Sequence, residues 1–193
     1  NDGHIIATED NTTVTEFSTD GGTTTRTLNK GDQSAFTYDT GSQFTGRSVR
    51  LVADKPISAE SQADSDGGEM TPFAGKNAFG KQFVIPENER EFVKLVSNVP
   101  AVATAYDQSG NVLSTTTLTG SATNKVYNAR LTGTSSYEGV LIETDQPVYA
   151  INEGEADDET VLFAHYPNEF SVNYSPKIVT DDLVLYLDAA NPK

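Results

Sequence analysis

The chain has 193 residues with 13 basic and 28 acidic side chains, which gives a net charge of −15, and it contains no cysteine and no tryptophan. The negative charge excludes nucleic acids and anionic membranes as main partners, because both require a basic protein surface. The lack of cysteine excludes disulfide bonds, thiolate nucleophiles and cysteine-ligated zinc.

The length suffices for one large domain or for two smaller ones, each with a core of its own. The longest apolar run, 183–187, is too short to span a bilayer. The sequence starts at Asn1 without an initiator methionine and stops shortly after this apolar run. We therefore expect it to be a segment of a longer polypeptide.

The elements that the sequence predicts are β-strands. Threonine, which is β-branched and suits a half-exposed pleated sheet, occurs 24 times. Apolar residues alternate or form short runs at 49–53, 99–106 and 140–142, and the one stretch with helical character, 87–96, is short. Turn signals occur at 20–22, 29–31, 40–41, 109–111, 119–120 and 133–134. This spacing is typical of an antiparallel sandwich or barrel and predicts an all-β fold.

Landmarks recur in the same order along two parts of the chain. Residues 51–59 and 141–150 share a leucine, an Asp-x-Pro motif that marks a turn and an alanine, with Pro56 and Pro147 lying 91 positions apart. Further matches lie at 63–69 and 153–159, at 73–74 and 163–164, and at 14–22 and 102–110, with exit strands ending at Pro86 and Pro176. The sequence therefore predicts two tandem, similar antiparallel β-sandwich units (jelly-roll or immunoglobulin-like) at 1–78 and 79–170, each with its own core.

Two acidic loops leave calcium binding open. Residues 63–69 place carboxylates at alternate positions beside glycine, loosely as the start of an EF-hand loop does, and 153–159 holds a second group of acids. Neither loop has the terminal acid at the spacing that an EF-hand requires. The alternative is a solvated loop whose charge keeps exposed strand edges from pairing.

The sequence holds no set of residues that indicates catalysis. Its two histidines, His4 and His165, occur without a Gly-x-Ser-x-Gly motif, and no glycine-rich stretch continues into the Lys-Ser/Thr of a phosphate-binding loop. A glycosidase-type carboxylate pair carries no information among 28 acids, and a sugar-stacking tryptophan is missing. We therefore predict that the protein is not an enzyme and has no cofactor, and we assign no catalytic, cofactor-binding or metal-binding residue.

The third predicted segment, 171–193, carries a resemblance to a known family. Residues 178–192, Ile-Val-Thr-Asp-Asp-Leu-Val-Leu-Tyr-Leu-Asp-Ala-Ala-Asn-Pro, resemble the opening strand of concanavalin/laminin-G-like domains in structural proteins of tailed phages. The two repeats more loosely resemble the β-rich modules that precede such a domain, through a Gly-Arg, strand and Ala-Asp-Lys-Pro pattern at 46–56. The resemblance implies that 171–193 is a linker and the opening strand of a further, lectin-like C-terminal domain.

Together these features predict a non-enzymatic virion structural protein, such as a head decoration, neck or tail fibre component on the particle surface. It is expected to act as a rigid β-spacer that attaches to other virion subunits and displays a distal domain. Expected partners are other virion proteins and further copies in a homo-oligomer, with host-surface glycans reached through the distal domain, and neither nucleic acid nor membrane. The alternative is a bacterial surface adhesin or carbohydrate-binding module. Host, position on the particle and stoichiometry stay open.

Overall fold

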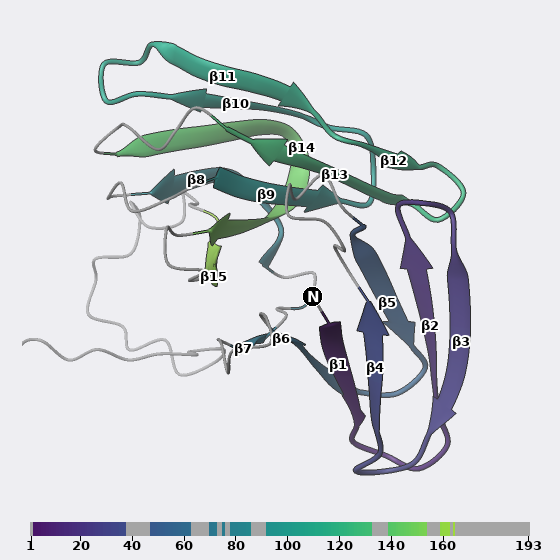
Figure 1. Cartoon of the computed structure of the whole chain (residues 1–193). Coiled ribbons are helices and arrows are strands. Elements are labelled where there is room, and N and C mark those ends of the chain that lie inside the picture. The colour runs from purple at the N-terminus through teal and green to yellow at the C-terminus, as the bar shows by residue number, and fades with distance from the viewer. Residues whose placement is uncertain are drawn as a thin grey trace, which may run out of the picture.

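The computed structural model describes residues 2–37, 47–62, 70–72, 75, 78–85, 92–132, 139–153, 159–162 and 164. These residues form fifteen β-strands and no α-helix, which confirms the all-β prediction (Figure 1). In this part of the chain, no helix has the length and hydrophobicity needed to cross a membrane.

Strands β1–β7 make up what we call the first half, and β8–β15 the second half. The first half contains β1 (Asp2–Ala7), β2 (Thr12–Ser18), β3 (Thr23–Leu28), β4 (Gln33–Thr37), β5 (Val49–Ala53), β6 (Ile57–Gln62) and β7 (Met70–Pro72). The second half contains β8 (Gly80–Ile85), β9 (Phe92–Ser97), β10 (Val102–Tyr106), β11 (Val112–Thr117), β12 (Thr119–Ser121), β13 (Val126–Leu131), β14 (Val140–Glu153) and β15 (Glu159–Leu162).

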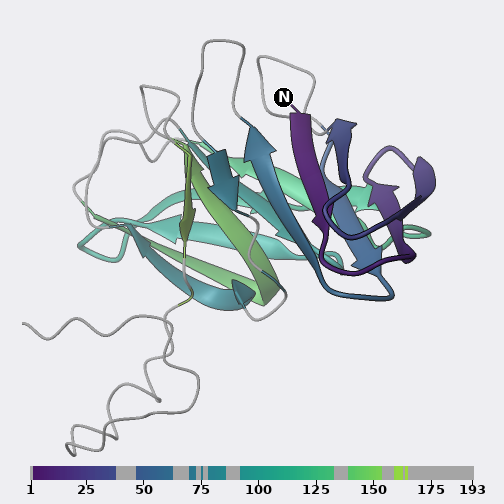
Figure 2. The same ribbon diagram turned by 90° about the horizontal axis from the view of Figure 1, so that it is seen from below.

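The first half is built from two antiparallel sheets. One has the strand order β4-β1-β6-β7 and the other the order β3-β2-β5. Four strands facing three is also the strand count of an immunoglobulin constant domain, although the strand order differs. Figure 2 shows the purple and blue strands of this half beside the teal and green strands of the second half.

In the second half, one long strand belongs to both layers. The first part of β14 pairs with β10 and β8, and its last part pairs with β9 and β15. The register shifts between Glu143 and Val148, where the strand leaves one layer and enters the other. One layer therefore has the order β11-β10-β14-β8, and the other has the order β12-β13-β9-β14-β15.

Strand pairing follows the same plan in both halves. β1 lies between β4 and β6 as β9 lies between β13 and β14, and β2 lies between β3 and β5 as β10 lies between β11 and β14. Ile5 faces Ala59 and Leu95 faces Ala150, so equivalent residues are 90 and 91 positions apart. This common plan supports the predicted duplication, while the unit boundaries stay predictions.

The Asp-x-Pro motifs make equivalent hydrogen bonds in the two halves. Asp54 Oδ1 accepts a hydrogen bond from the N–H of Thr13 at 2.8 Å, and Asp145 Oδ1 accepts one from the N–H of Val102 at 2.7 Å. In the first half the motif separates β5 from β6, as the turn interpretation predicts. In the second half it lies inside β14, because the chain crosses between the layers there without leaving the strand.

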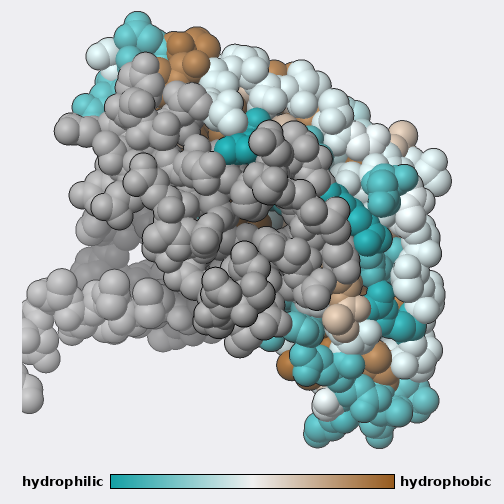
Figure 3. Space-filling view, viewed as in Figure 1, coloured by the Kyte–Doolittle hydropathy of each residue, from teal (hydrophilic) through white to brown (hydrophobic). Residues whose placement is uncertain are grey.

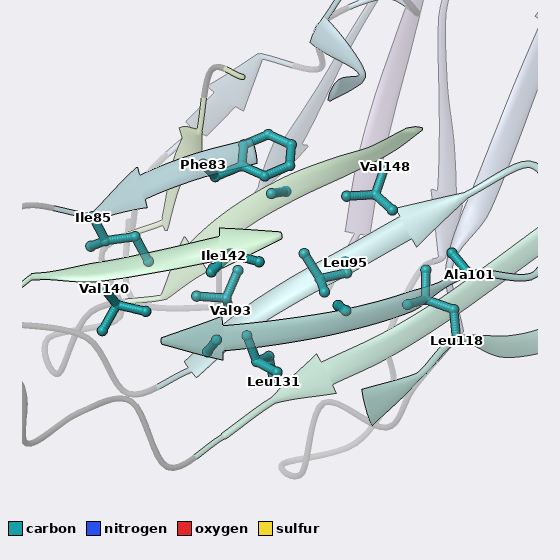
Figure 4. Close-up of a cluster of buried hydrophobic side chains, with 13 residues drawn as sticks. Phe83, Ile85, Val93, Leu95, Ala101, Leu118, Leu131, Val140, Ile142 and Val148 are labelled. Atoms are coloured by element: carbon teal, nitrogen blue, oxygen red, sulfur yellow. The ribbon is translucent and has the colours of Figure 1, made fainter. Parts of the chain in front are cut away.

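Each half has its own hydrophobic cluster, and among the described residues neither cluster includes a residue of the other half. In the first half the buried members are Ile5, Ala7, Val14, Leu28 and Phe36. In the second half they are Phe83, Ile85, Val93, Leu95, Ala101, Ala103, Ala105, Leu118, Leu131, Val140, Ile142, Val148 and Ala150 (Figure 4). Within the described residues, the first-half core is therefore the smaller one.

One local expectation differs from the structure. Residues 119–120, expected to form a turn, lie in β12, where Gly120 allows close pairing because a Cβ there would collide with the carbonyl oxygen of Val126. In the stretch with helical character, 87–96, the described residues belong to strand β9 (Phe92–Ser97), with Val93 and Leu95 in the core, which agrees with the all-β prediction, and 87–91 lie outside the described residues. The turn signals at 20–22, 29–31 and 109–111 connect strands as predicted, whereas 40–41 and 133–134 lie outside the described residues.

Candidate functional site

A pocket of about 530 Å³ lies at one end of the outer face of the β8–β14–β10 layer. This volume is within the range of small-ligand sites. The pocket is lined by residues of these three strands and of the turn after β10. They are Val84, Tyr106, Asp107, Gln108, Gly110, Gly139, Val140, Leu141 and Glu143.

The strand register explains why three apolar side chains form the floor of this pocket. Tyr106 lies opposite Leu141 on one side of β14, and Val84 lies opposite Leu141 on the other. Their neighbours along each strand are fully buried in the core. These neighbours are Ala105, Ile142 and Phe83. Because successive side chains of a strand point to opposite faces, the row of Tyr106, Leu141 and Val84 faces outward.

A polar row runs beside the apolar row. Thr104 lies opposite Glu143, and Glu143 lies opposite Gln82. The side-chain amide of Gln82 donates a hydrogen bond to Oε1 of Glu143 at 2.8 Å, which fixes this carboxylate at the pocket wall. The pocket therefore combines an aromatic and aliphatic floor with a positioned carboxylate.

Asp107 stabilises the turn that forms the rim. Its carboxylate accepts hydrogen bonds from the backbone N–H groups of Ser109 and Asn111, both at 2.8 Å, and from Nδ2 of Asn111 at 2.9 Å. Gly110 adopts φ = +82°, a left-handed conformation that glycine adopts without strain. The hydrogen bonds from the Asn111 side chain and backbone favour the ionised carboxyl and hold the pKa of Asp107 below its ordinary value of 3.8.

In the first half an aspartate also stabilises the β2–β3 turn but from a different position, because Asp20 directly precedes Gly21 whereas Asp107 lies three residues before Gly110. Asp20 accepts hydrogen bonds from the hydroxyl of Ser18 and from the N–H of Gly22, and these bonds lower the pKa of Asp20. Gly21, like Gly110, has a positive φ, here +91°. In both the β2–β3 hairpin and the β10–β11 hairpin, an aspartate side chain thus accepts backbone hydrogen bonds within the turn.

Asp107 should make the fold sensitive to acid. Because folding lowers its pKa below 3.8, its contribution to stability is fully present above about pH 4 and is lost as the pH falls through the folded pKa. We expect the thermal midpoint to fall less between pH 6 and pH 2.5 in Asp107→Asn than in the parent protein. Ser109→Ala is the matched control, since it keeps the carboxylate and should show the full decrease. Equal decreases in Asp107→Asn and in the parent protein would contradict this assignment.

The pocket has groups that can bind a sugar ring, and one of its two carboxylates is not suited to act as a general acid. An aromatic ring beside aliphatic side chains can pack against the apolar face of a sugar ring, whose hydroxyl groups can donate to a carboxylate such as that of Glu143. Asp107 is ionised at neutral pH and its oxygens already accept three hydrogen bonds, so it lacks the proton that a general acid must supply.

A second site joins the two halves through a buried asparagine. Asn124, only 3% exposed, lies in the turn between β12 and β13. Its side-chain amide donates one hydrogen bond to the carbonyl of Ser18 at 2.9 Å and one to the carbonyl of Gly22 at 2.8 Å. Both donor hydrogens are thereby used on the β2–β3 turn, which fixes the turn of one half against the turn of the other.

Arginine and a second asparagine complete this junction. Arg50 donates from Nη2 and Nε to the carbonyl of Asn124, at 3.0 and 3.2 Å, while its guanidinium lies 4.5 Å from the centre of the Phe17 ring. Asn128 Nδ2 donates to Oγ of Ser48 at 2.9 Å. The junction is therefore polar, directional and partly desolvated, which favours one relative orientation over many.

The residues that the sequence singled out lie mostly elsewhere. The acidic loop 63–69 connects β6 to β7 and lies outside the described residues, as do 154–158 between β14 and β15. The structure therefore leaves calcium binding at these loops open. His165 also lies outside the described residues, and His4 lies in β1 opposite Ala35 and Glu60. Segment 171–193 is not described.

The pocket and the junction were not found from the sequence. Tyr106, Asp107 and Glu143 are separated along the chain and meet only through the register of β10 and β14. Asn124 and Ser18 are 106 positions apart, and an asparagine in a hairpin turn gives no sign of a distant partner. The nearest signal is the repeat itself, which places 106–110 at the equivalent of 18–22.

Comparisons with protein families, with curated proteins and with solved structures found no match for the chain. Its function is therefore argued from its own residues.

Proposed function

We propose that the chain is a non-enzymatic structural protein of a phage virion, in which the two β-sandwich halves form a rigid spacer. The observation that carries the spacer role is the junction at Asn124, where hydrogen bonds at 2.8 and 2.9 Å fix one half against the other. The virion assignment is supported by the sequence resemblance of 178–192 and by the duplicated topology.

A spacer on a particle surface is exposed to solvent, and the hydrophilic surface of the described residues is compatible with such a role. Figure 3 shows pale to teal, that is weakly to strongly hydrophilic, surface over most of the described residues that this view exposes. The edge strand β3, with sequence Thr-Thr-Thr-Arg-Thr-Leu, is exposed along most of its length. The net charge of −15 opposes non-specific association in solution. Attachment to other virion subunits and formation of a homo-oligomer remain part of the proposal.

Asn124→Ala should loosen the junction between the two halves, although the contacts of Arg50 with the Asn124 carbonyl and of Asn128 with Ser48 do not involve the Asn124 side chain. The substitution removes the Asn124 amide from the carbonyls of Ser18 and Gly22, which keep their hydrogen bonds within the β2–β3 turn, so we expect a cost of about 0.5–1.5 kcal/mol for each hydrogen bond lost. Residual dipolar couplings measure the effect: one alignment tensor should fit both halves of the parent protein, and two tensors should be needed for Asn124→Ala. Thr123→Ala, an exposed change in the same turn, should still fit one tensor. Two different tensors in the parent protein would refute the spacer.

Location is tested separately. Antibodies against the chain should label intact phage particles in electron micrographs of the native source. Labelling confined to the bacterial cell surface would replace the virion assignment by an adhesin.

The second candidate function, an adhesin or carbohydrate-binding module, is favoured by one observation. The pocket at Tyr106 and Glu143 has the apolar floor and acceptor groups that a sugar ring requires. A glycan array discriminates the two, since binding that is present in the parent protein and absent in Tyr106→Ala supports the second function.

A further inference from the structure

Equivalent strands of the two halves differ in what covers one edge. The first part of β14 has β10 on one side and β8 on the other. Its counterpart β5 has β2 on one side and, among the described residues, no strand on the other, so it ends the β3-β2-β5 sheet. In the second half, strand β8 therefore occupies the position that is open beside β5.

Burial along the two strands reflects this difference. Val140, Ile142 and Thr144 are at most 9% exposed. The corresponding side chains of β5 face the same way, because they lie opposite the buried face of β2, but they are only partly buried. These are Val49, Leu51 and Ala53. An apolar row at an open sheet edge is a template for pairing with another strand.

The strand that closes the edge in the second half has a simple pattern. Phe83 and Ile85 of β8, 0% and 4% exposed, point into the core opposite Ile142 and Val140. Between them, Val84 points outward and is 53% exposed. Two large apolar side chains, two positions apart, therefore complete the core beside β14.

We propose that the open edge of β5 binds an added antiparallel strand of the β8 type, supplied by another polypeptide segment, with large apolar side chains two residues apart. By equivalence with β8, the residue in the place of Phe83 lies opposite Leu51 and the residue in the place of Ile85 lies opposite Val49. The strand continues the β3-β2-β5 sheet as β8 continues the β11-β10-β14 layer. Main-chain hydrogen bonds supply affinity and the two apolar anchors supply register.

The charge of β5 is compatible with this role. Natural edge strands commonly carry charged side chains that prevent pairing. The one charged residue of β5 is Arg50, and its guanidinium is engaged with the carbonyl of Asn124 and the ring of Phe17. The site goes beyond the spacer role, and its test stands whether or not the protein belongs to a virion.

The probe is a synthetic peptide with the sequence of residues 78–87, Ala-Phe-Gly-Lys-Gln-Phe-Val-Ile-Pro-Glu, added to the full chain. We expect saturable binding with NMR shift changes centred on residues 49–53, and a higher thermal midpoint for the first half. A peptide with lysine in place of Phe83 and Ile85 should not bind. Of two peptides N-methylated on alternate amides, only one should bind, because only one set of amides faces β5.

Variants of the chain locate the site. Leu51→Lys should weaken binding about tenfold or more, because it removes an apolar contact of one anchor. Val52→Lys places the same charge on the outward face of β5, and this variant should bind the peptide as the parent protein does. The comparison separates the effect of the lost apolar contact from the effect of the added charge. If Leu51→Lys fails to fold, the paired N-methylated peptides test the same contact in the parent protein.

Three outcomes would overturn the proposal. The first is no binding at millimolar peptide, and the second is binding with shift changes outside 49–53. The third is binding of a peptide of residues 178–187 and not of the β8 peptide, because the partner pattern would then be a different one.

Discussion

Phe83→Ala should lower the free energy of unfolding of the second half by about 3–5 kcal/mol, the range measured for large aromatic side chains removed from a packed core. Phe83 is fully buried and lies on the edge strand β8, opposite Ile142 (Figure 4). Its ring packs in the hydrophobic core between the two layers of the second half. A domain of this size is stable by about 5–15 kcal/mol, so one substitution removes a large part of the total.

The measurement is denaturant unfolding followed by hydrogen exchange, which separates amides of the two halves. Val84→Ala is the matched control, because Val84 is the next residue of the same strand and points to solvent. It should change stability by less than about 0.5 kcal/mol. If Phe83→Ala and Val84→Ala had equal effects, β8 would not be an integral strand of the second half.

The Asp-x-Pro landmarks of the predicted repeat can be recognised in the sequence because their chemistry is local. Pro56 and Pro147 fix the backbone, and the aspartates two positions before them cap the start of β2 and of β10 through equivalent hydrogen bonds. Landmarks of this kind are visible in one sequence at a nearly constant offset, between 88 and 91 positions. The pairing of strands then repeats with nearly the same offset, 90 and 91 positions at the β1–β6 and β9–β14 pairs.

What the sequence does not reveal depends on contacts between distant segments. The apolar pattern of β8 predicts a strand, yet it does not indicate that β14 is its partner, because register is set by two strands together. The pocket has the same origin, since Tyr106 and Leu141 meet only across β10 and β14. Alternation in β2 is also ambiguous, because Val14 and Phe17 lie on opposite faces of the strand. The structure places Glu16, and not Phe17, on the buried face.

Glu16 is held in the first-half interior by two arginines. It is 3% exposed, and its two oxygens lie 2.6 Å from Nη2 of Arg26 and 2.8 Å from Nη2 of Arg47. Arg26 also donates from Nη1 to the carbonyl of Ala35 on β4, at 2.6 Å, so the group connects the two sheets. The equivalent position in β10, Ala105, is a buried alanine, and no such ion pair occurs at that point.

Glu16→Ala should therefore cost the first half about 3–5 kcal/mol, because removing the buried carboxylate leaves the largely buried guanidinium of Arg26 without its charge partner. With a core of five buried apolar residues among those described, the first half has little other stability to spare. Hydrogen exchange should show increased exchange in β1–β6 and little change in β8–β15. Glu9→Ala, an exposed acid on the same half, should leave the first half folded.

A compensating variant separates charge from packing. Glu16→Met combined with Arg26→Leu replaces the shared ion pair by apolar side chains, while Arg47 keeps its contact with Asp20 at 3.5 Å and is 25% exposed. Replacements of this kind are commonly neutral or stabilising, so most of the loss in Glu16→Ala should be recovered. If the double variant were as unstable as Glu16→Ala, the first half would require this glutamate for its geometry and not for its charge balance. If Glu16→Ala itself were as stable as Glu9→Ala, the ion pair would contribute nothing to the fold.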